Sequence, residues 1–328
     1  MFASHVHNFR GLAIMLIVLA HVVSVFDWSS HPELMRWFKI SFANISVFFL
    51  FISGYLFQHL IARFEYRKYL KTKLANVILP YILISLPAVV LFTAVMQRPG
   101  IRAGFYDQSV PLQVAEFYLT GTHLAPFWFI PTVAVYYLMS PLLRLADRTP
   151  GFYWSLPFWI LMTVLFTRQG NPLINCIHYL SVYLTGMACS RHRQVATEWL
   201  SRGWWVLLFP LVLLIWVEYT FTIGTHGWQN TLQKLALCLI FFEFLRRWGA
   251  GADRWLARAG TLSFGIFFIH SYVISAAKVV MAQAGWVPLA GDLPALFAAS
   301  AVFILASMMV VTAAKTMTGR YSRQMIGC

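Results

Sequence analysis

The chain has 328 residues, of which 59% are hydrophobic and 11% are charged, and its mean hydropathy is +0.67. Because about a quarter of an ordinary soluble domain is charged, this composition excludes a water-soluble enzyme, a disordered scaffold and a disulfide-stabilised miniprotein. The formal net charge of +14 comes from 25 Lys and Arg against 11 Asp and Glu. Membrane proteins collect Lys and Arg on cytoplasmic loops, so we interpret this charge as a sign of membrane topology rather than of nucleic-acid binding.

Ten apolar stretches are close to the length that crosses a hydrocarbon core about 30 Å thick. Backbone in lipid must satisfy its own hydrogen bonds, and these stretches lack the alternation of a barrel strand, so we expect helices. The predicted fold class is therefore all-α, a polytopic membrane protein forming a single transmembrane domain over residues 1–328. The ten predicted spans are residues 9–26, 40–59, 74–95, 124–143, 152–167, 173–189, 204–223, 231–245, 261–282 and 293–314.

Positive charges segregate between the two sides that these spans define. Eighteen of the 25 Lys and Arg fall in the segments that lie inside if the N-terminus is inside, and only five fall in the outer loops. This bias predicts that both termini are cytoplasmic. The first span has no small-x-small cleavage site after it, so we expect a permanent helix rather than a signal peptide.

The cysteines indicate neither a metal site nor a disulfide framework. Cys176, Cys189, Cys238 and Cys328 are scattered, mostly within apolar segments, with no ligand-type spacing. We therefore predict no bound metal.

Two histidines fall at the same predicted depth. An ionisable side chain at a helix centre costs about 2.5–3.5 kcal/mol on insertion scales, so each one points to function. His21 follows Arg10, at the inner interface, by eleven residues, and at 1.5 Å per residue it lies about 16 Å into the core. His270, ten residues beyond Gly260, arrives at about 15 Å. We predict a proton-handling pair, in which a buried neutral imidazole serves as a general base.

Other polar residues within the spans have simpler interpretations. His178, about 9 Å from the outer face, is expected to hydrogen-bond between helices. Glu218 and Lys234 are expected to pair near the outer surface, and Glu243 to pair with one of the two arginines that follow it by one turn. Taken alone, Arg10 is typical of an arginine at the inner end of a membrane helix, whose guanidinium group extends to the membrane–water interface.

Four motifs, in order along the chain, resemble those of membrane-bound acyltransferase family 3, the O-acyltransferases of bacterial surface polysaccharides and related glycans. Arg10 and His21 match the family's basic-residue, ten-spacer, histidine signature, and Ser53-Gly54 matches its aromatic-rich Ser-Gly helix. The four motifs are Asn8-Phe9-Arg10-Gly11-Leu12 through His21, Phe48 through Phe57, Phe127-Trp128-Phe129-Ile130-Pro131 through Leu138, and Leu262-Ser263-Phe264 through His270.

The resemblance implies a stand-alone O-acetyltransferase in the cytoplasmic (inner) membrane of a bacterium. It implies transfer of an acyl group, most commonly acetyl from acetyl-CoA, to a hydroxyl of a sugar or polysaccharide at the outer face. No tightly bound cofactor is expected. The expected partners are acyl-CoA, a carbohydrate or lipid-linked glycan acceptor, the lipid bilayer, and proteins of polysaccharide synthesis or export.

The resemblance also suggests a role for each motif residue. We expect His21 to take the proton of the acceptor hydroxyl and Arg10 to hold the charged part of the donor. His270 or Ser53 would orient His21 or donate a hydrogen bond to the oxyanion. Trp128 would line the cavity.

Two other classes of protein fit part of this pattern. A proton-coupled secondary transporter also has many helices with titratable groups near the midplane, but it predicts inverted repeats and paired broken helices, which we do not detect. A structural subunit of a polysaccharide-export complex would tolerate substitution of both Arg10 and His21.

Overall fold

The structure is a computed structural model that describes residues 4–221, 227–248 and 253–328. Regular structure in these ranges is helical apart from one isolated bridge between Asp27 and Ala290. The α-helices are α1 (Ser4–Val22), α2 (Pro32–Phe42), α3 (Val47–His59), α4 (Tyr66–Lys73), α5 (Leu79–Val90), α6 (Val110–Thr120), α7 (Phe129–Leu138), α8 (Ser140–Arg148), α9 (Leu156–Leu165), α10 (Pro172–Arg191), α11 (Arg193–Gly203), α12 (Leu208–Phe221), α13 (Trp228–Trp248), α14 (Asp253–Gln283), α15 (Leu293–Thr318) and α16 (Ser322–Met325). Short 3₁₀ or π segments, among them η3 (Leu74–Ile78), η4 (Leu91–Val95) and η8 (Gly319–Tyr321), join or extend several of these helices.

Each of the ten predicted stretches falls on one or more of these helices. Six helical stretches in the described residues are long and apolar enough to cross a membrane, and the bent pair of α7 and α8 would make a seventh. Helices α10 and α13, at 20 and 21 residues, have the length but carry many polar side chains. The molecule is thus an all-helical, multi-pass membrane protein, and ten spans remains a prediction. The six stretches are Ser4–Val25, Pro32–His59, Tyr66–Val95, Arg193–Phe221, Arg254–Gln283 and Leu293–Met325.

Two predicted spans contain breaks. Within residues 124–143, α7 and α8 meet at 59°. The cause is Pro141 in the first turn of α8, because proline has no N–H and its ring clashes with the preceding turn of a continuous helix. Within residues 40–59, α2 ends before α3 begins, and Asn44 in the break has a φ of +58°. Asparagine tolerates this left-handed conformation better than most residues.

Helices α3 and α10 approach each other backbone to backbone. A Cβ atom added to Gly54 would lie 2.0 Å from the carbonyl oxygen of Tyr183, and one added to Gly186 would lie 2.1 Å from that of Phe51. These distances are too short for any side chain, so only glycine fits at both positions. The Ser53-Gly54 step therefore allows a close helix contact, as small residues do in membranes.

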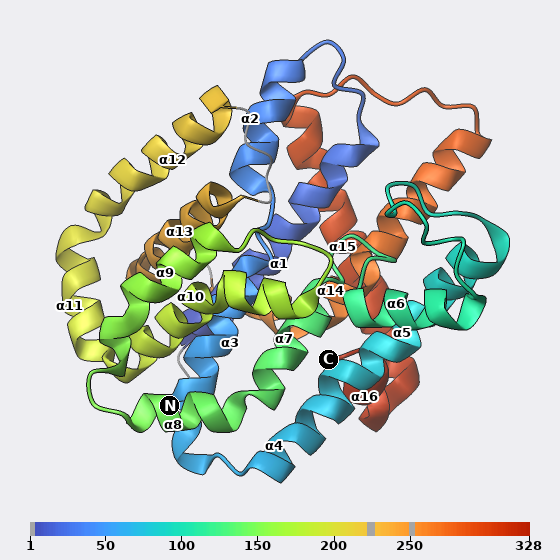
Figure 1. Ribbon diagram of the computed structural model, residues 1–328. Coiled ribbons are helices and arrows are strands. Elements are labelled where there is room, and N and C mark those ends of the chain that lie inside the picture. The colour runs from blue at the N-terminus through green and yellow to red at the C-terminus, as the bar shows by residue number, and fades with distance from the viewer. Residues whose placement is uncertain (1–3, 222–226, 249–252) are drawn as a thin grey trace.

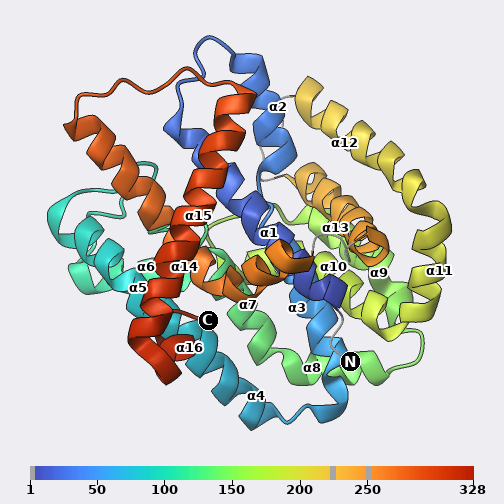
Figure 2. The ribbon, with the colours of Figure 1, turned by 180° about the vertical axis from the view of Figure 1, so that it is seen from behind.

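Helices α1 and α14 form a second glycine contact and run parallel. A Cβ atom on Gly11 would lie 2.1 Å from the carbonyl oxygen of Leu256, and one on Gly260 would lie 2.5 Å from that of His7. Arg10 contacts Ser263 and, farther along both helices, His21 contacts His270, so the two helices run in the same direction. Figures 1 and 2 show α1 in the middle of the molecule, whereas the last turns of α14 reach one edge and α12 lies at the opposite edge.

The two ends of the helix bundle differ in their charge. Helices α4, α8 and α16 and the start of α1 lie at one end, which we call the basic end, and the α1–α2 and α14–α15 connections lie at the other (Figure 1). The start of α1 and helix α16 are therefore on one side, and that this side is cytoplasmic remains a prediction. Basic residues on these three helices are Arg67, Lys68, Lys71, Lys73, Arg144, Arg148 and Arg323.

Candidate functional site

The structure brings His21 and His270 together. Their ring centroids are 5.3 Å apart, with the rings tilted by 40°. His21 is the second-last residue of α1 and is partly exposed, whereas His270, within α14, is fully buried. Because the two helices run parallel, equal distances from their first turns place the two rings side by side.

The hydrogen bonds of His270 fix where its proton sits. Nδ1 lies 2.9 Å from the carbonyl oxygen of Ile266. A carbonyl oxygen can only accept, so Nδ1 carries the hydrogen in the neutral ring and Nε2 carries the lone pair. Nε2 has only a long contact of 3.5 Å with the Ser271 hydroxyl. Among the described residues, the ring of His21 forms no hydrogen bond, so its nitrogens are free to meet a substrate.

Arg10 lies at the other end of the α1–α14 contact. Its Nη2 donates to the Ser263 hydroxyl at 2.9 Å, and that hydroxyl donates to the Gly260 carbonyl oxygen at 2.8 Å. Arg10 also lines a pocket of about 750 Å³. The pocket is lined by Ser4, His7, Asn8, Arg10, Ala257, Thr261, Lys315, Ser322, Arg323, Gly327 and Cys328.

The pocket is positively charged. Arg10, Lys315 and Arg323 line it, and among the described residues no Asp or Glu side chain does so. Lys73 lies within electrostatic range of Arg10 and Arg323, and its ammonium group lies 4.9 Å from the ring centroid of Tyr137. Such a cluster suits an anionic ligand with several charges.

The pocket stops short of the histidine pair, because neither His21 nor His270 is among the residues that line it. Along α1, eleven residues separate Arg10 from His21, which is about 16 Å of helix. An extended ligand lying along α1 would therefore be needed to connect the two.

Ser53 faces the same side of α3 as Phe49, one turn away. The ring of Phe49 lies 6.2 Å from that of Phe267, which in turn lies 6.3 Å from His270. Ser53 is partly exposed, and no side-chain hydrogen bond to it is present within the described ranges. It is thus on the helix face directed toward α14, and among the described residues it forms no side-chain hydrogen bond with either histidine.

Trp128 lies in a separate stack of side chains. The guanidinium of Arg168 is 4.2 Å from the centroid of its ring, and the ring of Tyr179 is 5.2 Å away. Arg168 also donates to the side chain of Asn44 in the break between α2 and α3. Trp128 is buried. Within the described residues, its ring contacts Phe129 and Tyr179 but neither His21 nor His270.

His178 is fixed by hydrogen bonds on both ring nitrogens. Nδ1 lies 2.5 Å from the carbonyl oxygen of Phe166 and Nε2 lies 2.7 Å from the hydroxyl of Thr231. The residue is fully buried. These contacts fit the interhelical role expected of it, and the structure does not bring it to the histidine pair.

The two buried glutamates behave differently. Glu243 pairs with both following arginines, at 2.7 Å to Arg246 and 2.5 Å to Arg247, which confirms the expected pairing with one of them and adds the other. Glu218 accepts from Asn230 and Gln233, and Lys234 donates to Gln233 at 3.4 Å. Within the described residues, Glu218 and Lys234 are thus joined through an amide and not by a direct ion pair.

A serine–histidine pair that the sequence did not indicate lies near α5 and α6. Nε2 of His123 is 2.8 Å from the hydroxyl of Ser85, and Nδ1 is 3.0 Å from the carbonyl oxygen of Phe117. Both side chains are fully buried. Both ring nitrogens of His123 are engaged and neither residue lines one of the two pockets described here, so we assign this pair to packing.

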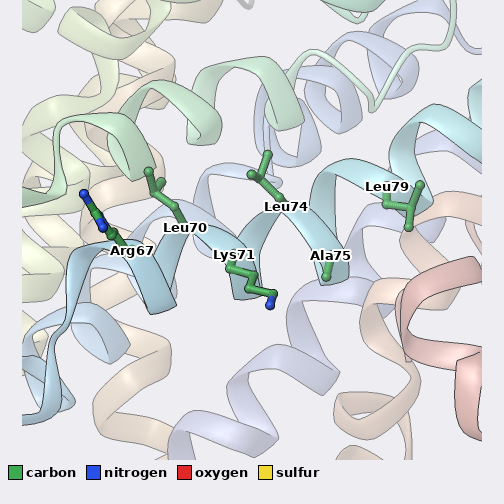
Figure 3. Close-up of a pocket in the computed structure, with 6 residues that line it drawn as sticks. All are labelled: Arg67, Leu70, Lys71, Leu74, Ala75 and Leu79. Atoms are coloured by element: carbon green, nitrogen blue, oxygen red, sulfur yellow. The ribbon is translucent and has the colours of Figure 1, made fainter.

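A second hollow, of about 550 Å³, follows α4 and the start of α5 on the outside of the bundle (Figure 3). Leu74 is 56% exposed there and Leu79 39% exposed, which suits a surface in contact with lipid. None of its side chains is a general base or nucleophile at neutral pH. The hollow is lined by Arg67, Leu70, Lys71, Leu74, Ala75 and Leu79.

Comparison with known proteins assigns the chain to a family. The model of the acyltransferase domain of acyltransferase family 3 matches residues 5–314. No curated protein and no solved structure matches the chain. The matched range contains Arg10, His21 and His270 and ends before Arg323. A match over nearly the whole chain, which includes the helices that carry the histidine pair, shows that the protein belongs to acyltransferase family 3.

Proposed function

We propose that the protein is an integral-membrane O-acyltransferase that moves an acyl group, acetyl from acetyl-CoA, to a hydroxyl of a sugar or polysaccharide at the outer face of a bacterial cytoplasmic membrane. One observation carries the proposal. His21 and His270 meet on parallel helices, and the same pair of helices holds Arg10 in a positively charged pocket at the basic end.

The donor is proposed to enter from the basic end. Coenzyme A carries several phosphate charges at one end and the thioester at the end of a long pantetheine arm. Phosphates are strong partners for Arg and Lys, so the nucleotide suits the pocket around Arg10. The arm would then lie along α1, parting the side chains between Arg10 and His21 until the thioester reaches the histidines.

His21 is proposed to act as the general base. It takes the proton of the acceptor hydroxyl as the oxygen attacks the thioester carbonyl, and the new C–O bond forms as the C–S bond breaks. The proton then passes to the departing thiolate, which leaves as the thiol of coenzyme A. The free Nε2 of His270 can accept a hydrogen bond from His21 and so set its orientation. Ser53 is proposed to donate a hydrogen bond to the developing oxyanion.

The acceptor is proposed to enter from the opposite end and to pass Trp128 on its way to the histidines. Arg168 and Tyr179 hold the indole of Trp128 in place. The bulky indole would thus form a rigid part of the acceptor passage, and His178, bonded on both nitrogens, would support the helices around it. Proteins of polysaccharide synthesis or export would supply the glycan.

The proposal is tested by the variant His21→Ala. Loss of a general base typically costs 10²–10⁴-fold in rate, so we expect ester formation to fall by roughly that factor while the protein still folds. The measurement is mass spectrometry of envelope glycans from cells with each variant, together with release of free coenzyme A by purified protein. His31→Ala is the matched control, because His31 is exposed and its side chain forms no cap hydrogen bond.

Full activity of His21→Ala would remove His21 from the mechanism. The same assays separate an enzyme from a carrier. Flux of a solute through reconstituted protein, without any consumption of acetyl-CoA, would identify a proton-coupled transporter.

A further inference from the structure

Part of the pocket wall comes from residues that lie beyond the family match. The match ends at residue 314, and residues 315–328, which we call the C-terminal segment, follow it. The segment begins at Lys315 in the last turn of α15. The chain then reverses through η8 and α16, and its final residues pack against α14. The segment contributes Lys315, Ser322, Arg323, Gly327 and Cys328 to the pocket.

The C-terminal segment is docked by close contacts. Gly327 has a φ of +85°, and a Cβ atom there would lie 2.9 Å from the ring of Phe264 and 3.2 Å from that of Phe268. Glycine is required on both counts. Ile326 is buried, and a Cβ atom on Gly265 would lie 2.7 Å from the sulfur of Cys328. The segment thus packs on the same part of α14 that leads to His270.

This docking brings like charges together. Arg323 lies within electrostatic range of both Arg10 and Lys73. None of these three forms an ion pair with a carboxylate among the described residues. Cations that lie close together without an acidic side chain paired to them repel one another, and an anion between them removes that repulsion and adds charge-assisted hydrogen bonds.

We propose that the C-terminal segment completes the donor site and that Arg323, with Lys315 beside it, binds a phosphate of the nucleotide part of acyl-CoA. The inference rests on the proposed function, which places the donor in this pocket. The affinity of the protein for acyl-CoA then depends on residues 315–328, which lie outside the range that the family model matches. Arg10 is the cation that α1 contributes to the lining of the pocket, whereas Arg323 comes from α16 and Lys315 from the end of α15.

The test compares donors with and without phosphate. We would measure the binding of acetyl-CoA, of its 3′-dephospho form and of S-acetylpantetheine to the purified full-length chain in nanodiscs. For Arg323→Gln we expect about tenfold weaker binding of acetyl-CoA, the effect of one charge-assisted hydrogen bond, and unchanged binding of S-acetylpantetheine. Arg323→Lys keeps the charge and should recover most of the loss. A loss that persists with the dephospho donor assigns Arg323 to the diphosphate, and one that disappears assigns it to the 3′-phosphate.

A matched control lies three residues away. Arg320 is exposed on the same segment, but its guanidinium lies over the ring of Tyr321 and donates to that residue's hydroxyl instead of lining the pocket. Arg320→Gln should therefore leave the affinity for acetyl-CoA unchanged. Equal losses in the two variants would mean that general surface charge is responsible and would overturn the proposal.

Two further outcomes would contradict the inference. An equal loss of affinity for acetyl-CoA and S-acetylpantetheine in Arg323→Gln would show that the substitution deforms the pocket and that Arg323 binds no phosphate. Normal binding of acetyl-CoA by Arg323→Gln would overturn the inference and leave the roles of His21 and Arg10 intact. If the unmodified chain bound no acetyl-CoA at all, the donor assignment of the proposed function would fall with it.

Discussion

Arg10 is held by a hydroxyl group and not by a carboxylate. Its Nη2 donates to Ser263, and no ion pair to it is present within the described ranges. The neutral partner fixes the position of the guanidinium without cancelling its charge. An arginine held in this way keeps its charge for an anion and presents its remaining N–H donors to the pocket.

Substitution of Arg10 should separate charge from geometry. We expect Arg10→Ala to lower kcat/KM for acetyl-CoA by about a hundredfold, because the charge and its hydrogen bonds are both lost. Arg10→Lys keeps the charge but not the paired donors, and we expect a milder loss of about tenfold. Steady-state kinetics with purified protein measures both. Equal losses in the two variants would show that the fork geometry, and not the charge, is what the donor needs.

The residue scale also shows what the sequence could and could not predict. Counting residues from Arg10 and from Gly260 predicted that His21 and His270 lie at one depth, and the two rings meet because α1 and α14 are parallel. Arg323 was only a cytoplasmic charge in the sequence. Its place in the pocket depends on a chain reversal and on contacts of Gly327 with α14, which no local pattern encodes.

At the scale of elements, glycines set the distances between the helices that carry the site. Gly54 and Gly186 bring α3 against α10, and Gly11 and Gly260 bring α1 against α14. Small residues in a membrane helix often serve only to let a neighbouring helix approach, and for Gly54 the structure supports that role. The break at Pro141 could have been expected from proline chemistry, but the 59° angle depends on tertiary packing.

A methyl group at position 54 should destabilise the fold. In Gly54→Ala the new Cβ atom would collide with the backbone of Tyr183, and overpacking of this kind costs about 1–3 kcal/mol. We expect a clearly lower Tm in detergent, measured by intrinsic fluorescence. Gly203→Ala is the control, because a Cβ atom there meets nothing within 4 Å. Equal Tm values for the two variants would mean that α3 and α10 can separate without cost.

At the scale of the whole molecule, the bundle has a basic end and an end with little basic charge, and the proposed donor and acceptor approach from opposite ends. The sequence predicted this sidedness from its charge bias alone. It predicted the helical class, but it placed the start of some stretches too late, because the stretch predicted to begin at residue 40 begins at Pro32 and that predicted to begin at residue 74 begins at Tyr66. Six of the ten predicted stretches lie in helices of the described residues that are long and apolar enough to cross a membrane. Helices α10 and α13 are not among them, because they carry polar residues buried between helices, such as Asn175 and Gln233.

Labelling with a membrane-impermeant maleimide tests the orientation. In a Cys328→Ser background, we expect Val287→Cys, 82% exposed in the α14–α15 connection, to react in intact cells. Met317→Cys, 86% exposed near the basic end, should react only after the membrane is opened. The physical reason is the charge bias, which holds the basic end in the cytoplasm. The reverse pattern of labelling would place the pocket outside and remove cytoplasmic acetyl-CoA as the donor.

The bond between His270 and the Ile266 carbonyl has a consequence for energetics. It occupies one imidazole nitrogen, so His270 can exchange a proton only through Nε2, and two charged rings 5.3 Å apart would repel. The site is therefore built to carry one mobile proton at a time. Under the proposed chemistry that proton ends on the thiol as the acyl group leaves in the other direction. Each turnover is then electroneutral, and neither the membrane voltage nor a pH gradient is needed to drive it.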